Sequence, residues 1–161
     1  HVVAMCGGRH RDLPVPEAVD VVILAIKDSA ISQVAQTFAD SKALVLHTSG
    51  SVPMDAIASL RRGVLYPLQT FSIDRNVDFR KIPLFLEART EEDMALLSQL
   101  ASAISDTNMP MDSERRRTLH LAAVLCCNFV NHLFSIFTIF DNRAYFYTAY
   151  FLFVTRITCC R

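Results

Sequence analysis

The chain has 161 residues, enough for one ordinary domain or slightly more, and its sixteen basic residues are balanced by sixteen acidic ones. An even charge lacks the electrostatic footprint of a nucleic-acid-binding protein, so that class of partner is not expected. The basic run Arg115–Arg117 fits a solvated helix face. None of the five cysteines has the spacing of metal ligands, so we expect reduced thiols in a cytoplasmic protein and no metal.

The first residues read as a strand followed by a basic turn. His1–Met5 fits a strand, and a start inside an element indicates a fragment or a processed product, with no signal peptide visible. Basic residues just after the second strand of a dinucleotide-binding fold often contact the adenosine ribose or its 2′-phosphate. Arg9, His10 and Arg11 could do so, and an ordinary exposed turn is the alternative. The glycine pair beside them lacks the GxGxxG spacing of a phosphate loop.

A strand–helix–strand unit follows. Asp20–Ile26 is a continuous aliphatic run, which indicates a strand buried on both faces of a parallel sheet. Apolar residues at helical spacing begin at Ile31, and Asp28 or Ser29 is a suitable N-cap for that helix. Ala43–Leu46 is too short for a helix and reads as the next buried strand.

The next stretch alternates short strands and helices. Pro53 suits the first turn of a helix, and Pro83 predicts either an edge strand or the first residues of a strand. The predicted elements are a helix with Ala56, Ile57 and Leu60 on its apolar side, strands over 64–66 and 82–88, a helix opened by Thr90 and Asp93, and a loop or short strand over 106–111.

A long helix is predicted from Ser113, with an apolar stripe that continues to Leu133. From Phe134 the composition changes, because nine of the fifteen aromatic residues lie between that residue and Phe153. Asp141–Arg143 interrupts the apolar run, so neither half reaches the ~20 residues of a membrane span. A buried helix pair and a tail foreign to the native fold are the two alternatives.

The segment His47–Ser51 is the predicted functional edge. It offers an imidazole, three hydroxyls and a glycine that lets a ligand approach the backbone closely. In open α/β sheets, ligands bind outside the carboxyl ends of strands. His47 is a candidate acid or base, with a structural hydrogen-bonding role as the alternative. The GxSxG pattern of a nucleophile elbow is absent, so the hydroxyls and Gln69 are expected to bind a ribose, an amide or a carboxylate.

Five segments, taken together and in order, resemble one group of proteins. They are Asp20–Ile31, His47–Gly50, Tyr66–Phe71, Leu119–Ala123 and Asn128–Phe129. The chain resembles the bacterial Rossmann-like, NADP-oxidoreductase-related proteins that have a C-terminal domain of unknown function. Those are similar in plan to pyrroline-5-carboxylate reductases, deazaflavin-dependent NADP reductases and 6-phosphogluconate dehydrogenases. The resemblance covers about residues 15–133.

The resemblance implies an α/β fold in two parts. Residues 1–112 would form a Rossmann-type domain with a parallel sheet whose first strand and glycine-rich turn are missing. Residues 113–161 would begin a helical domain, often used for dimerisation, that is cut short or altered after about residue 133. The implied cofactor is NADP, with NAD as the alternative, and the implied partners are a small-molecule substrate and a second copy of the full-length protein. Without the glycine-rich turn, this polypeptide alone is expected to bind NADP poorly.

The resemblance also implies roles for individual residues. Related dehydrogenases place a lysine one turn before an asparagine on the interdomain helix, but here Val124 stands there, so acid/base work would fall to the histidines. The alternatives are a non-catalytic nucleotide-sensing or dimerising scaffold and an inactive fragment. The implied residues are His47, His120 and Asn128 for catalysis, Arg9, Arg11, Ala25, Ile26, Thr48, Ser49 and Gly50 for the cofactor, and Ser51, Pro67, Gln69 and Thr70 for the substrate.

Overall fold

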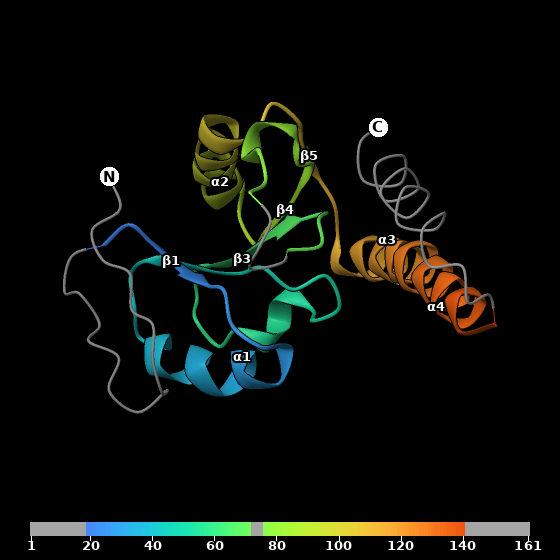
Figure 1. Cartoon of the computed structure of the whole chain (residues 1–161). Coiled ribbons are helices and arrows are strands. Elements are labelled where there is room, and N and C mark those ends of the chain that lie inside the picture. The colour runs from blue at the N-terminus through green and yellow to red at the C-terminus, as the bar shows by residue number, and fades with distance from the viewer. Residues whose placement is uncertain (1–18, 72–75, 141–161) are drawn as a thin grey trace. The chain divides into compact units, whose positions relative to one another are not determined.

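The structure is a computed structural model that describes residues 19–71 and 76–140 (Figure 1). The chain divides into two compact units, the first ending at Arg116 and the second beginning at Arg117. The predicted N-terminal strand and the basic turn with Arg9 and Arg11 lie outside the described residues, as does the aromatic-rich chain after residue 140.

Within the described residues, the first unit is built on one sheet of five strands, in the order β1-β2-β3-β4-β5. The strands are β1 (Val21–Leu24), β2 (Leu44–His47), β3 (Arg62–Pro67), β4 (Leu84–Ala88) and β5 (Asn108–Pro110). The α/β class is therefore confirmed. The pairs β1–β2, β2–β3 and β4–β5 are parallel, as predicted, but β3 and β4 are antiparallel.

The antiparallel pair has a physical cause in the connection that precedes it. A parallel pairing needs a long crossover, usually a helix, between the two strands. The described part of the connection from β3 to β4 contains one short 3₁₀ turn, Phe79–Lys81, and no α-helix. The chain therefore returns directly beside β3, and the sheet is mixed.

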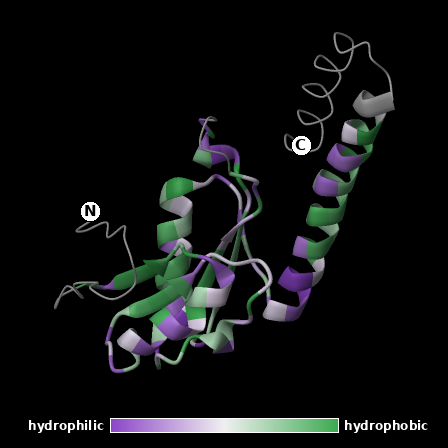
Figure 2. Ribbon diagram, turned by 60° about the horizontal axis from the view of Figure 1, so that its bottom comes forward, coloured by the Kyte–Doolittle hydropathy of each residue, from purple (hydrophilic) through white to green (hydrophobic). Residues whose placement is uncertain are grey.

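Helices lie on both faces of this sheet. Figure 1 shows α1 (Asp28–Ala35) and α2 (Glu91–Ile104) on opposite sides of the strands. Alternate residues of β2 point to opposite faces, so Leu44 and Leu46 pack in the core under α2, whereas Val45 packs in the core under α1. All three side chains are fully buried. Figure 2 shows the matching hydrophobic colouring along the strands.

Two helix starts test the predicted caps. The predicted cap of α2 is confirmed, because the Thr90 hydroxyl accepts a hydrogen bond of 3.1 Å from the Asp93 amide. The predicted cap of α1 is wrong, since Lys27 occupies the N-cap position without a side-chain hydrogen bond and Asp28 is the first helical residue. The Asp28 carboxylate instead bonds a hydroxyl in the loop that follows β2.

Two other predictions are wrong in the first unit. β1 is not buried on both faces, since Ile23 is 45% exposed. It lies at the end of the described sheet, and α2 packs on β3 and β4 rather than over it. The helix predicted after Pro53 is a single 3₁₀ turn, Met54–Ala56, and Leu60 is 73% exposed. That turn ends early because Ile57 takes extended backbone angles and buries its side chain under α1.

Strand β4 lies inside the sheet. It pairs with β3 on one side and β5 on the other, so the predicted edge position is wrong and the alternative holds, with Pro83 just before the first strand residue. The stretch over 106–111, predicted as a loop or a short strand, contains strand β5. Gly63 of β3 lies very close to strand β4, because an added Cβ would lie 2.5 Å from the Glu87 carbonyl oxygen.

The predicted long helix is present, with one irregular turn. It consists of α3 (Ser113–Val124), a π-helical turn (Leu125–Phe129) and α4 (Val130–Phe140). In the described part of the chain, the segment Ser113–Ile136 is long and apolar enough to cross a membrane on length and composition alone, and its apolar window is not buried. Side chains of its predicted apolar stripe, such as Phe129, are exposed.

Candidate functional site

His47 is the last residue of β2, and its side chain is fully buried. Its Nδ1 accepts a hydrogen bond of 3.2 Å from the Ser49 amide, which leaves the ring proton on Nε2. No described residue forms a hydrogen bond of normal geometry with that Nε2 atom. Burial, followed by the charge of Arg116, lowers the pKa of His47 to about 4, against the opposing effects of the Pro53 backbone and the Glu87 and Asp28 carboxylates. The imidazole is therefore neutral at pH 7.

Ser49 shapes the loop that leaves β2. Its hydroxyl oxygen accepts hydrogen bonds of 3.1 Å from the amides of Ser51 and Val52, and the residue is 7% exposed. This is the local turn that serine side chains form with the backbone two and three residues ahead. The turn commits the Ser49 oxygen to the loop and leaves Ser51 exposed at its tip.

Asp28 and Ser51 join two strand ends. The Ser51 hydroxyl donates a hydrogen bond of 2.6 Å to the Asp28 carboxylate. Ser51 follows β2 and Asp28 follows β1, and because these strands are parallel and adjacent, their carboxyl ends share one edge of the sheet. We call Asp28 together with Thr48–Ser51 the strand-end edge. Sequence reasoning missed Asp28 as a member, although its position just after a strand was a usable signal.

The other predicted cofactor and substrate residues lie nearby in the topology without joining this hydrogen-bonded group. Ala25 and Ile26 follow β1 directly, and Pro67 ends β3, the parallel neighbour of β2. The Gln69 side chain donates to the Thr70 carbonyl at 3.2 Å, a contact within its own loop. Their predicted roles in binding stay predictions.

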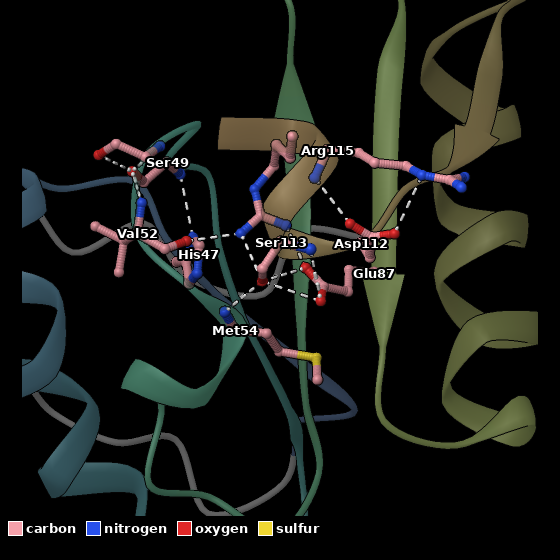
Figure 3. Close-up of polar contacts among 10 residues, drawn as sticks. His47, Ser49, Val52, Met54, Glu87, Asp112, Ser113 and Arg115 are labelled. Atoms are coloured by element: carbon pink, nitrogen blue, oxygen red, sulfur yellow. Dashed lines mark hydrogen bonds and ion pairs between the residues drawn. The ribbon is translucent and has the colours of Figure 1, made fainter. Parts of the chain in front are cut away.

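A second polar group lies beside the loop, as Figure 3 shows. Arg116, in the first turn of α3, is only 1% exposed and forms an ion pair with Glu87 of β4. Its guanidinium also donates to the Val52 carbonyl at 2.6 Å and to the Ser113 hydroxyl at 3.1 Å. Ser113 donates to both Glu87 carboxylate oxygens, at 3.0 and 2.8 Å, and accepts from the Met54 amide at 3.0 Å.

This second group corrects the prediction for the basic run. Arg115 and Arg117 are exposed, as a solvated helix face requires, but Arg116 is buried and fully engaged except at Nε. The run therefore mixes two surface residues with one buried ion-pair partner. Sequence reasoning could not separate them, because Glu87 lies on a strand far away in the sequence.

His120 and Asn128 belong to the second unit. In a regular helix, at about 100° per residue, residues eight apart lie about 80° from each other around the axis. The π-helical turn Leu125–Phe129 holds Asn128, and such a turn takes up one extra residue. The extra residue offsets most of that angle and brings His120 and Asn128 closer to one helix face. Their catalytic roles stay predictions.

The described residues contain no group of three or more His, Cys, Asp or Glu side chains that could hold a metal ion. Cys126 is an exposed thiol, and Cys127 is partly buried. At the strand-end edge, the described side chains offer hydrogen bonding by hydroxyls and by the Asp28 carboxylate.

Comparisons with known proteins agree with this fold. Residues 82–144 match a family described as a domain of unknown function, DUF2520. The chain is similar over 76% of its length to BF3122 from Bacteroides fragilis, described as a candidate NADP oxidoreductase, with 43% identity and a TM-score of 0.68. The chain is a Rossmann-like protein with a DUF2520 segment. The resemblance inferred from its sequence is thereby confirmed.

Two further solved structures share the fold of this Rossmann-like protein. Protein TM1727 from Thermotoga maritima is 25% identical over 76% of the chain, with a TM-score of 0.64. Prephenate dehydrogenase from Aquifex aeolicus, at 12% identity over 71% of the chain and a TM-score of 0.53, shows a likeness of fold alone. The chain covers 49%, 51% and 50% of the three solved chains, so it spans about half their length. No curated protein matches the sequence.

Proposed function

We propose that the protein is an NAD(P)-dependent oxidoreductase-like protein that binds NADP, with NAD as the alternative cofactor, and a small-molecule substrate. The observation that supports this most is the Asp28–Ser51 hydrogen bond, which joins the carboxyl ends of two adjacent parallel strands. Ligands of open α/β sheets bind at such edges. The 43% identity to a described candidate NADP oxidoreductase supports the same cofactor class.

The strand-end edge fits one end of the cofactor better than the other. Asp28 offers carboxylate oxygens that accept hydrogen bonds from ribose hydroxyls or a carboxamide, but a carboxylate would repel a phosphate. Ser51 is exposed beside it, and buried Gly50 brings backbone to the same edge. We infer that this edge takes the nicotinamide riboside end, where the bound nicotinamide would supply or accept a hydride.

His47 would act in this site as a neutral group. With a pKa of about 4 it carries no proton to donate as an imidazolium at pH 7, and its Nδ1 already accepts from the Ser49 amide. We propose that it holds the loop beneath the cofactor. An acid or base for the reaction would then come from another group, for which His120 is the predicted candidate and Asn128 its companion.

The burial and low pKa of His47 support a second function. A buried, neutral histidine at the strand end also suits a non-catalytic nucleotide-sensing scaffold that retains the edge and lacks acid/base chemistry there. Such a scaffold would act as a homodimer through its helical part, where an apolar stripe is exposed, and we propose a cytoplasmic, bacterial setting for either function. The exposed stripe residues are Leu121, Leu125, Phe129, Leu133 and Ile136.

Nucleotide titration tests the proposal. The product of the whole gene is titrated with NADPH and with NADH while nicotinamide fluorescence is followed. We expect a saturable change with NADPH. Asp28→Asn and Ser51→Ala should each lower the affinity for NADPH about tenfold, because each removes a hydrogen-bonding partner of one polar group of the nucleotide. Ser32→Ala, on the exposed side of α1, is the matched control. The absence of a saturable change with either nucleotide would refute the proposal.

Substrate turnover separates the two functions. If the bound nucleotide is oxidised or reduced when candidate small molecules are supplied, the oxidoreductase reading holds, and His120→Ala is expected to lower the rate more than His47→Asn. If the nucleotide binds tightly but its oxidation state never changes, and binding shifts the monomer–dimer equilibrium, the sensing scaffold is the better description.

A further inference from the structure

We infer that Glu87, Ser113 and Arg116 form a clamp that positions the loop Ser49–Met54, and with it the strand-end edge. Its relevance to nucleotide binding rests on the proposed function, but the positioning itself does not. Figure 3 shows Glu87 and Ser113 beside the loop residues Val52 and Met54.

The clamp holds the loop by its backbone at two points. Arg116 donates to the Val52 carbonyl at 2.6 Å, and the Ser113 hydroxyl accepts from the Met54 amide at 3.0 Å. The two points bracket Pro53, whose ring fixes its own φ angle. Because backbone groups are held, the path of the loop is fixed whatever side chains it presents to a ligand.

The clamp is itself rigid. Arg116 is 1% exposed and the Glu87 side chain 15%, so their ion pair lies largely away from water, where electrostatic interactions are strong. Ser113 closes the group, since its amide and hydroxyl both donate to Glu87 and its oxygen accepts from Arg116. Charge-assisted hydrogen bonds of this kind are short and directional.

A continuous path of hydrogen bonds leads from the clamp to the strand-end edge. Val52, held through its carbonyl by Arg116, donates its own amide to the Ser49 hydroxyl. Ser49 in turn receives the Ser51 amide, and the Ser51 hydroxyl bonds Asp28. A shift of Val52 is therefore passed to Ser49 and then to the exposed hydroxyl that would meet a ligand.

The test separates loop positioning from general stability. Amide hydrogen exchange is measured in the whole chain for loop amides, namely Ser51, Val52 and Met54, and for the core amides of Val45 and Leu46. Ser113→Ala removes the acceptor of the Met54 amide and leaves the buried ion pair. We expect Met54 to exchange at least about fivefold faster, the equivalent of one lost hydrogen bond, with core rates unchanged.

Two further variants act on the charges. Arg116→Met with Glu87→Met removes both charges together, so neither is left buried alone, and the fold is retained. We expect all three loop amides to exchange faster relative to the core. Arg116→Lys is compared with Arg116→Met alone. It keeps a positive charge beside Glu87 but cannot make the forked contact to Val52 and Ser113, so stability should be higher than in Arg116→Met while the loop amides stay unprotected. Arg117→Met is the exposed control.

The outcomes are distinct. The clamp is refuted if the loop amides keep their protection in these variants, or if loop and core amides accelerate together, which would report stability alone. NADPH affinity is then measured in the same variants and is expected to fall about tenfold in step with loop exchange. If the unaltered protein fails to bind NADPH, the proposed function falls while the exchange result still decides the clamp.

Discussion

Buried polar side chains at single positions set what the strand-end edge can do. His47 is enclosed at the end of β2, and burial lowers its pKa to about 4, with the Arg116 charge acting in the same direction. A histidine with that pKa is uncharged at pH 7, and here it accepts one hydrogen bond from the Ser49 amide. Ser51 and Asp28 are instead exposed and hydrogen-bonded to each other, so ligand contact falls to them.

The pKa of His47 gives a prediction for stability against pH. The folded-state pKa of about 4 lies below the ordinary histidine pKa of 6.5, so the unfolded chain takes up the proton first. The contribution of neutral His47 to the free energy of unfolding, about 3 kcal/mol in total, is complete above about pH 6.5 and is lost as the pH falls toward 4. Urea unfolding at several pH values should show a smaller loss in His47→Asn. A ring resonance of His47 that titrates near pH 6.5 would contradict this.

The Arg116–Glu87 pair gives a second prediction at the residue scale. Arg116→Met alone leaves a largely buried carboxylate without its cation, which is expected to cost about 3–5 kcal/mol of unfolding free energy. The double variant with Glu87→Met is expected to recover most of that loss, because both charges leave together. Arg117→Met, at an exposed position of the same helix, should change stability by less than about 0.5 kcal/mol. A single variant as stable as the control would refute the pairing.

At the scale of the elements, the packing of β3 against β4 limits which residue can stand at position 63. β3 and β4 approach each other so closely at Gly63 that an added Cβ would lie 2.5 Å from the Glu87 carbonyl oxygen and 2.9 Å from Leu46 Cδ2. Backbone cannot give way as a flexible side chain can. A glycine is therefore required at position 63 because a larger residue would meet β4. The atom it would meet first is the backbone oxygen of the clamp residue Glu87.

Gly63→Ala is expected to destabilise the protein by about 1–3 kcal/mol, the usual range for overpacking a filled interior. Denaturant unfolding of the variant and of Gln33→Ala, an exposed change on α1, provides the comparison. The variant should also perturb the amide signals of Glu87 and Leu46. Unchanged stability would show that β3 and β4 can separate at this point.

The start of α2 gives a prediction of smaller size. Thr90 accepts the Asp93 amide at 3.1 Å and caps the helix, and Thr90→Ala is expected to cost about 1 kcal/mol. Thr70→Ala, in an exposed loop, is the matched control in thermal unfolding. If both variants lost equal stability, the cap would contribute nothing specific.

At the scale of the whole molecule, the sequence predicted element types better than their surroundings. Continuous apolar runs located β1 and β2, and the Thr90 signal located α2, because those features are local. The antiparallel return of β4 was missed, since strand direction depends on the connection and not on the strand itself. The short turn after Pro53 was missed because long-range contacts override its local helical pattern.

In the candidate site too, local features were predicted from the sequence and contacts between distant residues were not. The cluster of hydroxyls at Thr48–Ser51 was visible in the sequence, as was the rule that ligands bind at strand ends. The burial of His47 and the clamp were not visible. Arg116, Glu87 and Val52 are brought together only by the folded sheet, and nothing near any one of them indicates the other two.

The central claim is that the strand-end edge receives the nicotinamide end of the cofactor, and amide chemical-shift mapping tests it most directly. NADPH is added to the isotope-labelled product of the whole gene. We expect saturable shifts at Asp28 and Thr48–Ser51, with the outer face of α2, at Ala95 and Gln99, unchanged. Saturable shifts confined to other parts of the protein, or none with either NADPH or NADH, would contradict it.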